Sequence, residues 1–405
     1  MPTGMMRFHM RTNSAAVLFS LSVSIGVTMV GLGIIWPILP ILAAQMGVGG
    51  FVVGTIIASF NVSRTACAPF VGRFSDRMGR KSFILIGLVL YAAVSCAYLA
   101  AHSAEALIAV RLAHGFTSLL VVPIAMALAA DIAPQGQLGS YMGTLNMAAM
   151  IGLGVGPTLG GVIQEHFGMP AAFYALCAVS LGTAAFVVFF VPPDRESGAI
   201  TRRTGTATFR QILADRTAFA IVLMRFFSAS GQGSVYTFLP IYAHQIGMSG
   251  SRFGILLSAN VFLIALMQRP VGRLADRTNP KRVVILGMFG VAVAVFCMPF
   301  SSDFWPLLAL NILMGMSTGF ILPGSLVITG HLGRTMGMAS LMSVTDAAYS
   351  FGMIVSPILS GVIFDALGVS WVFTAGAALI AVGGVVVAVL LRNYCPPVDC
   401  GPPGQ

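Results

Sequence analysis

The sequence GRFSDRMGRK at residues 72–81 returns as GRLADRTNPKR at residues 272–282, displaced by 200 positions. Each copy stands where a long apolar segment ends. A second pair keeps the same offset, because LPILAAQMGVGG at 39–50 and LPIYAHQIGMSG at 239–250 share seven of twelve residues. A constant offset over separate landmarks indicates two related halves. Two halves that can rock about a central site are the physical basis of a membrane transporter.

Apolar residues make up 57% of the 405 residues and charged residues only 8%, against about 25% charged residues in soluble domains. The length accommodates twelve membrane spans of roughly 20 residues. The apolar runs are longer than the roughly ten alternating residues of a transmembrane β-strand, so we predict an all-α integral membrane protein. The predicted helices cover residues 15–36, 51–71, 83–101, 104–128, 139–163, 171–191, 217–239, 252–271, 283–300, 304–327, 337–363 and 370–391.

The net charge of +10 comes from 22 basic against 12 acidic residues, and its distribution argues against nucleic acid as a partner. If both termini are cytoplasmic, 17 basic residues fall in cytoplasmic segments and only Arg252 falls on the far side. This is the bias of the positive-inside rule. No small-residue cleavage site follows the first apolar segment, which we interpret as a retained helix. We expect a multi-pass protein of a bacterial-type inner (plasma) membrane, in contact with membrane lipids.

The sequence divides into an N-terminal six-helix bundle at 1–191, a linker at 192–216, a second six-helix bundle at 217–391 and a tail at 392–405. The linker is the longest polar stretch and holds five arginines. We expect it to tether the halves on the cytoplasmic side as a solvated segment. A short amphipathic helix on anionic headgroups is the alternative.

Three stretches together resemble the major facilitator superfamily. The hairpin at 72–81 resembles the family's signature loop between its second and third helices. Arg111-Leu-Ala-His-Gly115 resembles its Arg-x-x-Gln-Gly motif, with His114 in place of the glutamine. Residues 152–161, GLGVGPTLGG, resemble a motif of twelve-helix drug:proton antiporters, including tetracycline-type exporters. The resemblance covers almost the whole chain and implies the major facilitator fold, twelve transmembrane helices in two pseudo-symmetric six-helix bundles.

Each hairpin combines a glycine, an aspartate and basic residues. We expect Gly72 to allow a close helix approach and Gly79 to form the tight turn. By resemblance, Asp76 latches the cytoplasmic side when the carrier faces outward, because a carboxylate accepts hydrogen bonds from an arginine and a helix N-terminus. Asp276 would be the mirror latch, and a basic loop that only sets topology is the alternative. The gating candidates are Gly72, Asp76, Arg77, Gly79, Arg80, Gly272, Asp276 and Arg277.

The glycines of residues 152–161 follow a helical spacing. Gly152, Gly156 and Gly160 share one face, which has the small-xxx-small pattern of close helix packing. Pro157 can kink the helix, and Gly161 follows it. We expect the glycine face to press against a helix of the other half. By resemblance, it seals the periplasmic interface.

Charged residues inside apolar segments need a cavity or a partner, since each costs about 2.5–3.5 kcal/mol at the centre of a membrane helix. The resemblance implies that Arg111 takes part in coupling proton to substrate movement. Arg64 and Arg225 are also deep, and the sole acid well inside a helix is Asp346, which either pairs structurally or carries a proton. His114 is a titrating group or a neutral core histidine. By resemblance, cavity-lining candidates are Trp36, Phe116, Tyr236 and Asn311.

No nucleotide-binding loop of the GxxxxGKS type and no metal-spaced His/Cys cluster occurs, so we expect neither an enzyme nor a bound cofactor. We predict a secondary active transporter that moves a small-molecule substrate by alternating access and acts as a monomer. The predicted task is efflux of a drug-like or amphiphilic compound in exchange for protons, with the proton gradient as energy source.

One feature departs from many proton-driven exporters, which hold an acid in the first helix. No acid occurs from Ala15 to Pro40 here, and three deep arginines accompany one aspartate. A positive cavity favours anionic or zwitterionic substrates, so an organic-anion (or siderophore-type) carrier is the alternative. A non-transporting scaffold or sensor is the third possibility, against which the two intact hairpins argue.

Overall fold

The computed structural model describes residues 14–134, 137–191 and 208–394. Within these ranges the chain is helical and contains no strand. The first six long helices are α1 (Ser14–Gln45), α2 (Gly50–Met78), α3 (Arg80–Ala100), α4 (Ala104–Ile132), α5 (Leu138–Phe167) and α6 (Met169–Phe190). The second six are α8 (Arg216–Gln245), α9 (Gly250–Arg277), α10 (Pro280–Cys297), α11 (Phe304–Met336), α12 (Met338–Leu367) and α13 (Val369–Leu390).

The prediction of a multi-pass helical membrane protein is confirmed. Among the described residues, eleven helices are long and apolar enough to cross a membrane. The twelfth long helix, α8, is more polar because it carries Arg225 and Gln232 near its middle. Several predicted helices were too short: the segment 51–71 is part of Gly50–Met78, and 304–327 is part of Phe304–Met336. Hydropathy marks the apolar stretch, whereas backbone hydrogen bonding continues the helix into its polar flank.

The hairpin turns show why the helices end where they do. Gly79 has a φ of +96°, which confirms the predicted tight turn, because side-chain-bearing residues rarely adopt this backbone. The second copy uses other chemistry. There the Asn279 side chain accepts a hydrogen bond from the Lys281 amide at 3.2 Å, and Pro280 occupies the first turn of α10, where a missing N–H is harmless.

Part of the linker is a helix. The short α7 (Phe209–Ala214) starts at a capping box formed by Thr208 and Gln211. Its Ile212 is buried with Leu341 and Val344 of α12. This stretch therefore packs on the protein rather than standing as a solvated tether, and residues 192–207 lie outside the described ranges.

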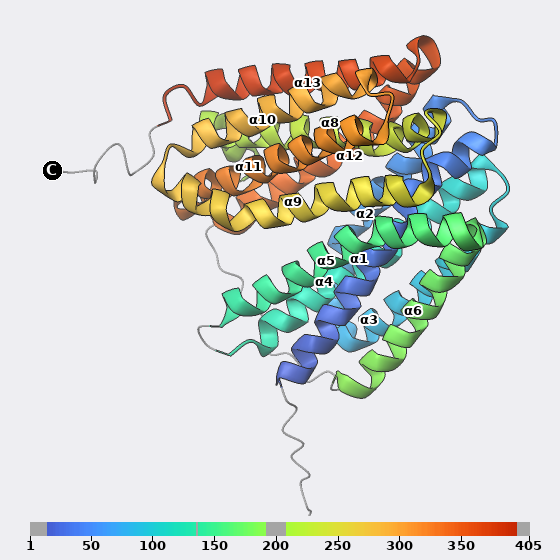
Figure 1. Ribbon diagram of the computed structural model, residues 1–405. Helices are drawn as coiled ribbons and strands as arrows, with labels where there is room; N and C mark the ends of the chain where they lie inside the picture. Colours follow the sequence, from blue (N-terminus) through green and yellow to red (C-terminus); the bar gives the residue numbers. More distant parts are fainter. Residues whose placement is uncertain (1–13, 135–136, 192–207, 395–405) are drawn as a thin grey trace, which may run out of the picture.

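The two bundles meet at one end and diverge toward the other (Figure 1). Helix α5 packs on α9, and α2 packs on α12. We call the end with connections 46–49, 168, 246–249 and 368 the joined end. The opposite end, where Ser14 and the hairpin turns lie, is the splayed end. An apolar cluster crosses the joined end, where Ile35 and Ile38 of α1 cluster with Phe238 and Ile241 of α8.

Candidate functional site

At the joined end, the two bundles approach each other backbone to backbone. A Cβ added at Gly161 of α5 would lie 2.1 Å from the Gly250 carbonyl oxygen of α9. The symmetric position repeats this, because a Cβ at Gly361 of α12 would lie 2.2 Å from the Gly50 oxygen of α2. No real Cβ fits at such distances, so these positions require glycine for as long as the bundles are joined.

The expected role of the glycine face in α5 needs a correction. Gly152, Gly156 and Gly160 pack against α1 of the same bundle, where an added Cβ would lie 2.3–2.9 Å from α1 backbone atoms. The prediction that this face contacts the other half is wrong. The contact across the halves comes from the neighbouring face, in which the Pro157 carbonyl meets Gly254. Sequence spacing identified close packing but not the partner helix, because both faces of α5 carry glycine.

Two repeat-related carboxylates also link the bundles at the joined end. Asp365 of α12 accepts hydrogen bonds from the backbone amides of Gly50 at 2.6 Å and Phe51 at 2.9 Å. Its repeat mate Glu165 of α5 accepts one from the Ser251 amide at 2.8 Å. Each carboxylate therefore lies at the N-terminus of a helix in the other half, where the helix dipole and free amides favour negative charge.

We expect Glu165→Gln combined with Asp365→Asn to loosen the joined end, because neutral amides are weaker acceptors at a helix N-terminus. Distances between spin labels at Gln45→Cys and Gln245→Cys, both exposed at this end, should lengthen in a cysteine-free background. Glu105→Gln is the control, since this exposed acid stands in the first turn of its own helix. An unchanged distance in the double variant would contradict a latching role.

An ion pair lies deeper, between α8 and α12. The Arg225 guanidinium donates to Asp346 Oδ1 at 2.9 Å, and the side chains are 21% and 69% exposed. Arg225 also stands 4.6 Å from the ring centre of Tyr349. The Tyr349 hydroxyl donates to Gln232 Oε1 at 3.1 Å. Arg225 is thus held by a ring as well as by the carboxylate.

Arg64 reaches this pair from the other half. Gly50 and Gly54 of α2 lie against Gly361 and Pro357 of the antiparallel α12, so Arg64 comes level with Ala347, next to Asp346. Arg64 interacts electrostatically with Asp346 and Tyr349. Among the described residues, it donates no hydrogen bond. The sequence predicted these deep charges singly; the structure brings three of them together at the boundary of the halves.

Arg111 lies inside the N-terminal bundle and not at this boundary. It is 2% exposed and donates to the carbonyl oxygens of Ile56 at 3.3 Å and Ile57 at 3.2 Å. Its guanidinium also stacks on Phe60 at 4.8 Å from the ring centre. Arg111 therefore joins α4 to α2. The coupling role implied by the resemblance stays a prediction.

His114 is equally internal, at 1% exposed. Its Nδ1 is hydrogen-bonded to the Tyr98 hydroxyl at 3.0 Å, and its Nε2 has no partner in the described structure. It lines a cavity of about 10 Å³ together with Arg64 and Tyr91, which has room for about one water molecule. This cavity lies within one bundle and is too small for a substrate.

The four residues that were predicted to line a cavity lie in three different environments. Trp36 and Tyr236 stack across the halves with ring centres 4.7 Å apart. Asn311 is fully buried, and its carbonyl oxygen accepts a hydrogen bond from Asn260 at 2.9 Å. Phe116 is 37% exposed and lies on the face of α4 opposite Ser118, which lines the small cavity. Phe116 is therefore turned away from the bundle interior.

Sequence reasoning missed Tyr349 and Gln232. Their spacing in the sequence could have identified them, because Tyr349 follows Asp346 by three residues and Gln232 follows Arg225 by seven. Those spacings return to the same helix face. Neutral polar residues in a membrane helix drew less attention than charges, yet these two hold Arg225 in place.

The structure describes the hairpins in part. The surroundings of Gly72 and the side chains of Asp76 and Arg77 lie outside the described set. Arg80 pairs with Asp131 of the same bundle, and Arg277 is exposed. The other second-hairpin candidates, Gly272 and Asp276, line a surface pocket at the splayed end beside Pro323. Within the described residues, Asp276 forms no ion pair, so its latching role stays a prediction. In the described ranges, no group of three His, Cys, Asp or Glu residues could hold a metal.

Comparisons with known proteins agree with this architecture. The family model of the Major Facilitator Superfamily matches residues 21–249 and 221–399. An uncharacterised MFS-type transporter of Methanocaldococcus jannaschii is 27% identical, over 89% of this chain and 94% of its own. Multidrug resistance protein 2 of Bacillus subtilis is 25% identical, over 92% and 94%. Quinolone resistance protein NorA of Staphylococcus aureus is 23% identical, over 93% and 97%.

Solved structures share the fold at low identity. A bacterial homologue of the human lysosomal transporter Spinster, in an inward-facing occupied conformation, superposes with a TM-score of 0.81 at 12% identity. The alignment covers 96% of this chain and 99% of that one. The nucleoside transporter NupG gives 0.75 at 13% identity, over 93% and 99%. With matching helices, repeat and family model, this chain belongs to the major facilitator superfamily of membrane transporters.

Proposed function

We propose that this chain exports an amphiphilic small molecule in exchange for protons, by alternating access in an inner (plasma) membrane with both termini in the cytoplasm. Two relatives named for multidrug and quinolone resistance support export. The basic residues near the splayed end favour the cytoplasm for that side. The conformation described above is then inward-facing, with its closure at the joined end.

The Arg225–Asp346 pair carries this proposal. Asp346 is the acid deepest in a described helix that reaches the boundary of the halves, and its 69% exposed side chain is accessible to a proton or a ligand. Protonation removes its attraction to Arg225 in its own bundle and to Arg64 in the other. A charge that differs between two conformations shifts their equilibrium. Proton binding at Asp346 can therefore be coupled to the movement of the bundles.

The test uses the purified full-length chain in liposomes with an imposed pH gradient. A piperazinyl quinolone is followed by its fluorescence, and protons are followed by a pH-sensitive dye inside the vesicles. We expect quinolone movement to be accompanied by opposite proton movement. In Asp346→Asn, coupled proton movement should fall to the level of empty liposomes, because an amide does not take up a proton near neutral pH.

Asp303→Asn is the matched control, since Asp303 is exposed outside the long helices and should leave coupling intact. Coupled exchange that survives Asp346→Asn would move the proton to another group, with His114 the next candidate. The absence of any flux in the wild type would favour the non-transporting scaffold.

A further inference from the structure

We infer that the substrates are zwitterionic amphiphiles, with the carboxylate bound by Arg64 and the ammonium bound by Asp346. This assignment rests on the proposed transport function and names the substrate class of the same site. It follows from which hydrogen-bonding groups of the cluster are already used and which are free.

The free groups are of opposite charge. Arg64 donates no hydrogen bond to any other described residue, so its guanidinium can take a carboxylate in bidentate geometry. Asp346 uses Oδ1 for Arg225, while its Oδ2 accepts no hydrogen bond within the described structure. One open cation and one open anion therefore lie on facing helices, within electrostatic reach of each other, which suits a ligand that carries both charges.

The other arginines do not compete for the carboxylate. Arg111 is 2% exposed and lies inside the N-terminal bundle, where it donates to two backbone carbonyls and stacks on the Phe60 ring, while its buried Nη1 has no partner in the described structure. Arg225 is held by Asp346 and Tyr349, so it positions the aspartate and limits the net charge of the site. A purely cationic ligand would meet two arginines beside one carboxylate, which is unfavourable.

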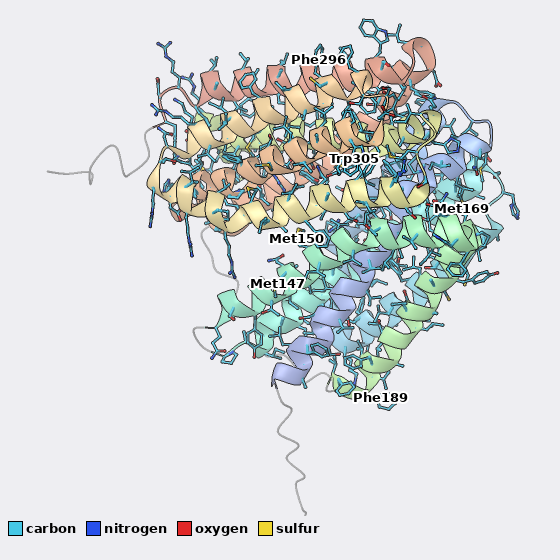
Figure 2. All side chains as sticks on the ribbon, viewed as in Figure 1. Met147, Met150, Met169, Phe189, Phe296 and Trp305 are labelled. Carbon is cyan, nitrogen blue, oxygen red and sulfur yellow. The ribbon has the colours of Figure 1, made fainter. Side chains whose placement is uncertain are left out.

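The site also spans the two halves. Arg64 belongs to α2 of the first bundle and Asp346 to α12 of the second. A zwitterion between them bonds to both bundles at once, so its binding differs between conformations that change their separation. Met147 and Met150 lie on the part of α5 that has parted from α9 and add apolar surface there (Figure 2). Methionine side chains adapt to differently shaped ligands.

The same geometry accounts for exchange with protons, because a proton and an ammonium compete for Asp346. Among the described side chains, the charged and titratable groups that face Asp346 are Arg225 of α8, Arg64 of α2 and Tyr349 of its own helix. Of the other elements packed on α12, α13 has no titratable residue. The α11 histidine, His331, is hydrogen-bonded to Tyr394, and Arg210 of α7 is exposed.

The experiment compares three ligands built on one ring system. A piperazinyl quinolone is the zwitterion, its methyl ester is the cation, and its N-acetyl derivative is the anion. Binding to the full-length chain in nanodiscs is measured by calorimetry, and proton exchange is measured in liposomes. We expect the zwitterion to bind at least about tenfold more tightly than either derivative, the ratio that one charge-assisted contact supplies.

The variants should act on separate ends of the ligand. Arg64→Ala should weaken the zwitterion about tenfold and strengthen the cationic ester, whereas Asp346→Asn should weaken the zwitterion and strengthen the N-acetyl anion. Arg269→Ala and Asp303→Asn are the controls, since both residues are exposed and lie away from the site. A structural role of Arg64 would instead weaken all three ligands equally.

Failures of the two proposals are distinguishable. If the ester binds as tightly as the zwitterion and exchanges for protons, export stands and the zwitterion assignment is overturned. If the zwitterion shows the expected pattern without proton movement, the site assignment stands and proton-coupled export is overturned. If no ligand of the set binds, the zwitterion assignment is overturned whatever the flux.

Discussion

Gly161→Ala combined with Gly361→Ala should move the protein out of the conformation described here. A Cβ at Gly161 or Gly361 would meet a backbone oxygen of the opposite bundle at 2.1 or 2.2 Å. Backbone cannot turn aside as a flexible side chain can, so the bundles must separate. Overpacking of this kind costs about 1–3 kcal/mol per site, which is a factor of roughly 5–150 in an equilibrium.

The measurement is the label distance between Gln45→Cys and Gln245→Cys, residues that end α1 and α8 at the joined end. We expect the long-distance population to become the major one in the double variant. Folding should survive, because the clash exists in only one of the two conformations that alternating access requires.

Gly182→Ala is the matched control, because an added Cβ at this α6 position meets nothing within 4 Å. It should leave the distance unchanged. If the double variant kept the wild-type distance as well, the glycines would not set the approach of the bundles, and the joined end would have to rest on its apolar cluster.

The second large effect is expected for Arg111→Ala, and it should appear in stability. The change removes two hydrogen bonds from a charged donor and leaves a cavity between α2 and α4. Together these losses should lower the free energy of unfolding by about 2–4 kcal/mol. Thermal unfolding of the purified protein in detergent should show a clearly lower melting temperature.

Arg269→Ala makes the same substitution at an exposed position of α9 and should unfold like the wild type. Two results together would overturn the structural role of Arg111. These are a wild-type melting temperature for Arg111→Ala and a loss of quinolone affinity in the folded protein. They would return Arg111 to the coupling machinery that the family resemblance implies.

The sequence alone could identify most residues of the candidate site but not the partners that they contact. Burial cost marks a charge in an apolar helix as needing a partner, so Arg64, Arg111, Arg225 and Asp346 stood out. The free-energy cost of burying the charge does not indicate which residue or helix supplies the partner. Arg111 offsets part of this cost with backbone carbonyls of its own bundle, and Arg225 offsets it with Asp346, 121 residues away.

Sequence by itself determined the helical membrane class, the two halves and the turn at Gly79, because lipid and local backbone sterics act on each segment separately. Tertiary structure alone decided which face of α5 meets α9, and that Glu165 and Asp365 contact helices of the opposite half. It also decided that Arg64 joins the Arg225–Asp346 pair. These contacts depend on how two bundles dock, and docking is set by the shape of whole surfaces. Residue spacing within one helix does not encode that shape.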